Sequence, residues 1–106
     1  MNISFKSSYY SFIKIEKVKT AEVCYKFINW LTMEYDLYQM DELEGLKVYY
    51  PNGWFTVELM TNFKFQTNIL INVKCKSLHK VKMQIAQIET LFNQFNQIFI
   101  KKELLN

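Results

Sequence analysis

The sequence predicts an α+β fold, with elements in the order β-α-β-β-β-α and both helices packed on one face of a single antiparallel sheet. Three observations predict it. Residues 54–65 alternate between apolar and polar side chains, the period of a strand with one buried face. The segments 20–39 and 77–104 repeat apolar residues at intervals of three and four, which is typical of amphipathic helices. Turn-forming residues flank the alternating segment on both sides, which predicts two consecutive hairpins.

The first strand is predicted over 9–17, and the first helix follows it. The segment YYSFIKIEK is rich in β-branched and aromatic residues, but both of its faces are partly apolar, so the pattern does not orient it. Thr20 is a candidate N-cap for the helix 20–39, because its hydroxyl can accept a hydrogen bond from the first turn. The helix is expected to run into an acid-rich stretch, 34–45, that stops at Gly45.

The stretch YYPNGWFTV predicts the tip of the first hairpin. Asn52-Gly53 is a favoured two-residue loop, because both residues adopt positive φ readily. This loop pairs Val48 with Val57, and it places Lys47 opposite Glu58. A three-residue loop that includes Pro51 would slip the strand by one residue and turn its apolar side chains to the wrong face. The sequence therefore predicts that Tyr50 and Phe55 point inward and that Tyr49 and Trp54 point outward.

The second hairpin and the last helix complete the predicted sheet and its cover. A three-residue loop at 66–68 pairs Phe65 with Ile69 and Leu59 with Cys75, and it assigns the same side chains to the buried face as the first hairpin does. Ser77 is a candidate N-cap for the last helix. This helix is about 42 Å long and the strand 54–65 is about 40 Å long, so we expect the helix to lie along the sheet.

Composition predicts one domain, 1–106, in the cytosol. Half of the residues are apolar, so the chain can form a core without disulfides, and Cys24 and Cys75 are expected to be buried free thiols. The N-terminus lacks the pattern of a signal peptide, and no apolar run approaches the roughly 20 residues of a membrane span. Lysine supplies all 13 basic residues, and residues with A+T-rich codons dominate, which indicates an A+T-rich genome such as that of a bacterium, its phage or its mobile elements.

No catalytic or metal-binding pattern emerges from the sequence, so we expect a binding protein rather than an enzyme, with no cofactor and no metal. His79 is the only histidine, and Cys75, four residues before it, is predicted to point into the core. Two glycines are too few for a phosphate-binding loop. An acidic group has a spacing that matches no calcium loop, and a solvated connection is the simpler interpretation; it consists of Glu34, Asp36, Asp41, Glu42 and Glu44.

The outer face of the predicted sheet is the first candidate binding surface, because no part of the chain remains to cover it. Exposed tryptophan and tyrosine beside lysine and methionine are typical of a protein-binding hot spot, and they would equally suit stacking on single-stranded nucleic acid. An open amphipathic face with nothing bound is the alternative. The predicted partner-binding residues are Tyr49, Trp54, Met60 and Lys64.

A second candidate is a lysine group at the start of the last helix, where helix N-termini attract anions; it consists of Lys74, Lys76, Lys80 and Lys82. From residue 20 onward the order of elements is also that of double-stranded-RNA-binding domains, a similarity of topology alone. A nucleic-acid-binding domain is therefore the alternative function. In a chain of net charge +3 with 13 lysines, some clustering by chance is also expected.

The back of the last helix is the third candidate, because it is rich in neutral Gln and Asn rather than in Lys and Glu. Such a face would suit a homodimer, although an A+T-rich genome also supplies asparagine without that reason. The predicted interface residues are Gln87, Leu91, Gln94 and Ile98. The leading prediction is a protein–protein interaction module, an accessory or inhibitor protein of a phage or mobile element.

Overall fold

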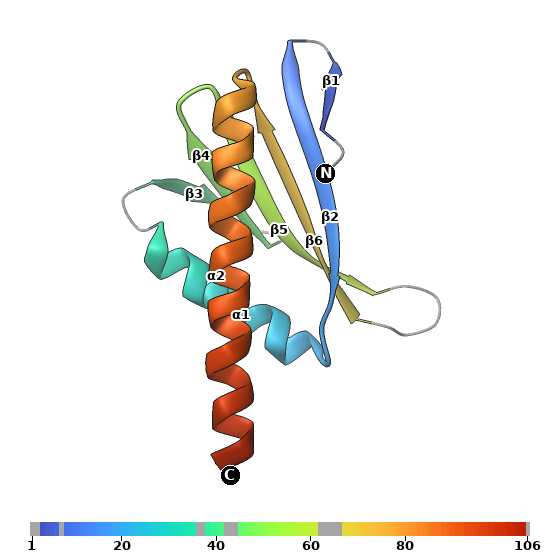
Figure 1. Cartoon of the computed structure of the whole chain (residues 1–106), viewed down its shortest axis with the longest axis vertical. Coiled ribbons are helices and arrows are strands. Elements are labelled where there is room, and N and C mark those ends of the chain that lie inside the picture. Colours follow the sequence, from blue (N-terminus) through green and yellow to red (C-terminus); the bar gives the residue numbers. More distant parts are fainter. Residues whose placement is uncertain (1–2, 7, 36–37, 42–44, 62–66, 106) are drawn as a thin grey trace.

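The computed structural model describes residues 3–6, 8–35, 38–41, 45–61 and 67–105, which form two helices and one six-stranded antiparallel sheet in the order β1-β2-β6-β5-β4-β3 (Figure 1). The elements are β1 (Ser4–Lys6), β2 (Tyr9–Lys17), α1 (Ala21–Glu34), β3 (Gln39–Asp41), β4 (Leu46–Tyr50), β5 (Gly53–Thr61), β6 (Thr67–Cys75) and α2 (Leu78–Leu105). The predicted α+β fold is confirmed. Two short strands that the sequence did not predict, β1 and β3, form the edges of the sheet.

Both helices pack on one face of the sheet. Figure 1 shows α2 running along the strands and α1 crossing it steeply, and the helices contact each other as well as the central strands β5 and β6. Phe27 of α1 joins the two helices, since its ring centre lies 5.1 Å from that of Phe92 and 5.4 Å from that of Phe95. Just after the last residue of α1, the ring of Tyr35 lies 5.0 Å from Phe55 of β5. The core therefore lies between the helices and one sheet face.

The alternation of the strands supplies this core. Every second residue of the central strands is buried against the helices, namely Leu46, Val48, Phe55, Val57, Ile69, Ile71, Val73 and Cys75. The predicted inward face of the two hairpins is thus confirmed, and Phe55 is completely buried. Tyr49 and Trp54 occupy the opposite face, as predicted, because they pair with each other and alternate with these buried residues.

The register of the first hairpin differs from the prediction by two residues. Tyr50 pairs with Gly53 and Lys47 pairs with Thr56, so the loop is Pro51-Asn52 and the predicted pair of Lys47 with Glu58 does not form. The turn chemistry explains the difference. Asn52 has φ +67° and follows a proline, which is the residue preference of a type II turn. A shift of two residues preserves the period of the strand, so the faces were predicted correctly although the pairs were not.

The second hairpin is shifted by six residues. Leu59 pairs with Ile69 instead of Cys75, and β5 ends at Thr61. The predicted loop residue Asn68 lies within β6, where its side chain is buried and it pairs with Met60. The predicted extension of the strand over 62–65 lies outside the described residues. Because six is also even, the predicted buried face is again retained.

Both predicted helix caps are present. The backbone N–H of Val23 donates to Thr20 Oγ1 at 3.3 Å, and that of Lys80 donates to Ser77 Oγ at 3.3 Å. The predicted end of the first helix at 39 is wrong, since α1 ends at Glu34. The reason is competition from the sheet, because Gln39–Asp41 pairs with β4 as the edge strand β3.

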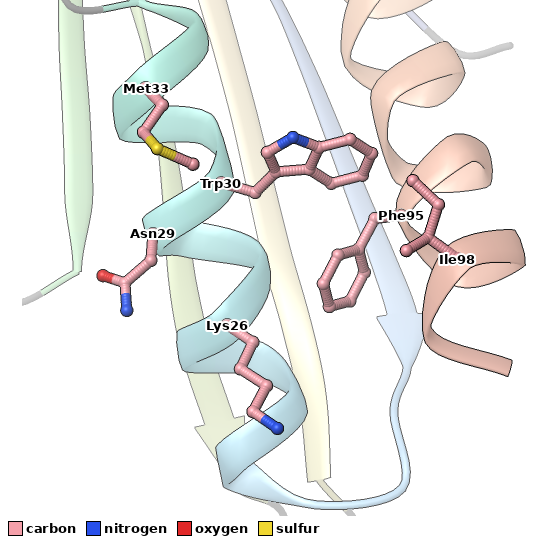
Figure 2. A pocket seen from close by; sticks show the side chains of 6 residues that line it. All are labelled: Lys26, Asn29, Trp30, Met33, Phe95 and Ile98. Carbon is pink, nitrogen blue, oxygen red and sulfur yellow. The ribbon is translucent and has the colours of Figure 1, made fainter. Parts of the chain in front are cut away.

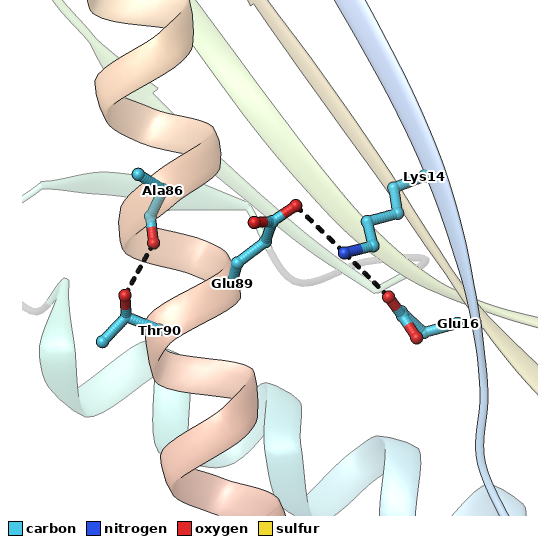
Figure 3. Close-up of polar contacts among 5 residues, drawn as sticks. All are labelled: Lys14, Glu16, Ala86, Glu89 and Thr90. Atoms are coloured by element: carbon cyan, nitrogen blue, oxygen red, sulfur yellow. Dashed lines mark hydrogen bonds and ion pairs between the residues drawn. The ribbon is translucent and has the colours of Figure 1, made fainter. Parts of the chain in front are cut away.

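Strand β2 lies beside β6, and its pattern explains why the sequence did not orient it. Tyr10 pairs with Cys75, so the even-numbered residues of β2 face the helices. Two of these inward positions carry charges. Lys14 Nζ lies 2.9 Å from a carboxylate oxygen of Glu16 and 3.0 Å from one of Glu89 on α2 (Figure 3). The hydrogen bond to Glu16 raises the pKa of Lys14 despite partial burial, and the ion pair with Glu89 joins β2 to α2.

Candidate interaction surface

The sheet face opposite the helices, here called the outer face, gathers aromatic and lysine side chains from four strands. The register sets Tyr49 opposite Trp54, and Trp54 opposite Lys74. Tyr9 joins them from β2, because its neighbour Tyr10 points toward the helices. The aromatic–lysine cluster consists of Tyr9, Lys47, Tyr49, Trp54, Lys74 and Lys76.

Trp54 lies at the centre of the aromatic–lysine cluster. Its ring centre is 5.4 Å from that of Tyr9, 4.9 Å from Lys47 Nζ and 5.7 Å from Lys74 Nζ. The remaining cation–π contacts join Lys47 to Tyr49 at 5.1 Å and Lys76 to Tyr9 at 5.6 Å. Attraction between ammonium groups and ring faces holds these lysines in place. The half-buried Trp54 therefore lies between a tyrosine ring and two ammonium groups on a cationic surface.

An aliphatic patch adjoins the cluster on the same face. Ile13 and Ile15 of β2 are 60% and 54% exposed. In the register with β6 they pair with Asn72 and Leu70, respectively. The side-chain oxygen Oδ1 of Asn72 is buried and has no hydrogen-bond partner among the described residues. A buried acceptor without a partner costs free energy, and this cost falls on the strand that lies between the cluster and the isoleucines.

The structure brings together only part of the predicted partner-binding set. Tyr49 and Trp54 are neighbours, and Met60 lies further along β5 on the same face, opposite Asn68. Lys64 lies outside the described residues. Sequence reasoning missed Tyr9, Ile13 and Ile15, because the charges at inward positions of β2 concealed which of its faces is open. The two isoleucines at alternate positions were the signal that could have revealed it.

The predicted anion-binding lysines do not form one group. Lys74 and Lys76 belong to the aromatic–lysine cluster on the outer face, whereas Lys80 and Lys82 are exposed on α2, which covers the opposite face. The alternation of β6 turns Lys74 away from the helix that begins three residues after the strand ends. The structure therefore divides the lysines between the two faces of the sheet.

The predicted dimer face on α2 is also altered. Leu91 is only 8% exposed and belongs to the core, because α2 packs against both α1 and the sheet and so buries a wide stripe. Gln87, Gln94 and Ile98 are exposed as expected. Ile98 borders a groove of about 310 Å³ between the two helices (Figure 2); the groove is lined by Lys26, Asn29, Trp30, Met33, Phe95 and Ile98.

The residues considered for catalysis or metal binding are dispersed. Cys24 and Cys75 are buried free thiols, and burial raises the pKa of Cys24 to about 11. His79 is exposed in the first turn of α2, and Glu34 is exposed at the end of α1. Asp36, Glu42 and Glu44 lie outside the described residues, and Asp41 lies in β3. Over the ranges that the structure describes, no group of three His, Cys, Asp or Glu side chains could hold a metal ion.

Comparison with known proteins places the chain in no family. No protein-family model matches the sequence, and no curated protein matches it. Within the described part of the chain, neither helix combines the length and the apolar character that a membrane crossing requires.

Proposed function

We propose that this protein is a non-enzymatic protein–protein interaction module that binds its partner through the outer face of the sheet. The observation that carries the proposal is the placement of Trp54, which the cluster holds on the face that the helices leave open. Hot spots are rich in tryptophan and tyrosine that are fixed before binding. The exposed Ile13 and Ile15 extend this surface with apolar area that a partner would bury.

The proposed setting is the cytosol of an A+T-rich bacterium, in which the protein acts as an accessory or inhibitor protein of a phage or mobile element. Codon bias in the composition supports this setting. The proposed contact residues are Tyr49, Trp54 and Met60, together with Tyr9 and Ile13, which the fold adds to them.

Substitution of Trp54 tests the proposal. Trp54→Ala is expected to keep the circular dichroism spectrum of the folded protein and to lose a partner that the immobilised wild type captures from source cells. Met83→Ala is the matched control, because Met83 is 58% exposed on α2, away from the outer face. Equal capture by both variants would contradict the proposal. Unfolding of Trp54→Ala would show that this side chain has a structural role instead.

A nucleic-acid-binding domain is the second candidate function. The observation that favours it is the collection of three ammonium groups, those of Lys47, Lys74 and Lys76, around aromatic rings. Binding of duplex RNA or single-stranded DNA through these lysines should weaken steeply as salt is raised, with a slope set by the number of phosphate contacts. The absence of binding at low salt would rule out this candidate.

We propose a homodimer only as an accompanying property. The exposed Gln87, Gln94 and Ile98 of α2 would form its interface, without Leu91. Sedimentation velocity at high micromolar concentration should show a dimer that Ile98→Ser weakens. A monomer under these conditions would leave the outer-face proposal standing and would remove the dimer.

A further inference from the structure

We infer that the partner presents an acidic segment with apolar side chains, whose carboxylates contact the lysines of the cluster and whose apolar side chains cover Ile13 and Ile15. This inference rests on the proposed function, and it names the chemical class of the partner. It requires a surface that is cationic at one end and aliphatic at the other. The outer face has this arrangement, because Lys74 and Ile13 lie on the neighbouring strands β6 and β2, with Lys74 paired to Ser11 and Ile13 paired to Asn72.

Among the described residues, no ion pair compensates the charge of Lys74 or Lys76. The ion pairs in the described part of the chain are made by Lys14 and Lys26, which lie outside the cluster. None of them involves Lys47, Lys74 or Lys76. An ammonium group has three N–H donors, so contact with a ring face leaves donors available to a carboxylate.

Glu58 is an acidic residue of the outer face, but it lies away from Lys74 and Lys76. Glu58 pairs with Leu70, four residue pairs along the sheet from the pair of Trp54 and Lys74. In the backbone register Asp41 pairs with Lys47. The test of the inference therefore substitutes Lys74 and Lys76 rather than Lys47.

The surroundings of Trp54 favour a protein segment over a nucleic acid. Tyr9, Lys47 and Lys74 flank the indole ring, so a base that stacked on Trp54 would have to displace them. A carboxylate binds the same ammonium groups where they lie.

The rest of the outer face supports the same choice. Ile13 and Ile15 offer aliphatic area from which a phosphate backbone gains nothing, whereas apolar side chains gain by burial.

The test selects binders from a displayed library of random peptides about twelve residues long, using three forms of the protein. These are the wild type, Lys74→Gln/Lys76→Gln, and the control Lys80→Gln/Lys82→Gln, which loses the same charge from α2. The wild type and the control should enrich peptides that combine several Asp or Glu with apolar residues. The strongest of them, measured by fluorescence anisotropy, should bind the Lys74/Lys76 variant at least about fivefold more weakly, and its binding to the wild type should weaken as salt is raised.

Three outcomes would overturn the inference, and they separate it from the proposed function. Enriched peptides without acidic bias, whose binding Trp54→Ala abolishes, would remove the acidic partner but keep the interaction surface. Peptides that bind Trp54→Ala as well as the wild type, or no enrichment at all, would remove both. Random single-stranded DNA or duplex RNA that binds more tightly than every peptide, and depends on Lys74 and Lys76, would assign the cluster to nucleic acid.

Discussion

Asn52 and Gly53 have different roles at the tip of the first hairpin. Asn52 occupies the left-handed region, with φ +67°, and its carbonyl oxygen accepts a hydrogen bond from Lys76 N–H at 3.0 Å. Gly53 lies in β5 itself, where a Cβ atom would overlap the backbone oxygen of Lys74 and approach Cys75 Cα to 2.9 Å. The same oxygen of Lys74 accepts a hydrogen bond from the Tyr50 hydroxyl at 3.1 Å. The glycine is thus required by close packing of β5 on β6.

Substitution of Gly53 is the prediction at this scale. Gly53→Ala should lower the free energy of unfolding by about 1–3 kcal/mol, because the added methyl group forces β5 and β6 apart. Asn52→Gly should leave it nearly unchanged, because glycine adopts positive φ without strain. Urea unfolding of both variants provides the measurement. A larger loss for Asn52→Gly than for Gly53→Ala would contradict this account of the turn.

At the scale of the elements, α1 depends on the aromatic contacts that join it to α2. Phe27 is completely buried and contacts two phenylalanine rings of α2, whereas Tyr25, two residues earlier, is 53% exposed. The ring of Trp30 adds a contact with Phe95 at 5.5 Å. The packing of one helix on the other therefore rests on a few large side chains along one stripe of α1.

We expect Phe27→Ala to cost about 3–5 kcal/mol of stability, the range for truncating a buried phenylalanine. Tyr25→Ala is the control on the same helix and should change stability by less than about 0.5 kcal/mol. Chemical denaturation followed by circular dichroism measures both. Similar effects of the two substitutions would show that α1 does not pack as described.

The elements also show what the sequence could predict and why the rest was missed. Strand faces were predictable because the errors in both hairpin registers, two and six residues, were even and preserved the alternation. The cross-strand residue pairs of the first hairpin were not predictable, since Pro51-Asn52 and Asn52-Gly53 are both acceptable two-residue loops in the same stretch. Strand β3 is three residues long, too short to give a periodic signal. Of the outer face, Trp54 was predicted, but Tyr9 required knowing the neighbour of β2.

For the whole molecule, several buried groups make stability depend on alkaline pH. Burial raises the pKa of Cys24 from 9.0 to about 11 and that of Tyr35 from 10.0 to about 12, the latter despite a hydrogen bond from Gln84. Burial likewise raises the pKa of Tyr50. In each case the thiol or hydroxyl group keeps its proton to a higher pH in the folded protein than in the unfolded chain. Their contribution is complete below about pH 9 and is lost as the pH rises toward 12.

Stability should therefore be level from pH 7 to about pH 9 and should fall above it. The urea midpoint measured at intervals up to about pH 11 tests this expectation. Tyr35→Phe, which removes the hydroxyl, should flatten part of the decline. A midpoint that rises with pH above 9 would contradict the sign of the effect.

The edge strand β1 covers only part of the strand beside it. It is three residues long and pairs with Tyr9–Ser11 of β2, so the outer edge of Phe12–Lys17 has no neighbouring strand among the described residues. Growth of the sheet by addition of further copies, the usual route to fibrous aggregates, would have to begin at this open segment. Two charged residues at inward positions of the same segment, Lys14 and Glu16, oppose such pairing, because a new strand would bring its own side chains against them.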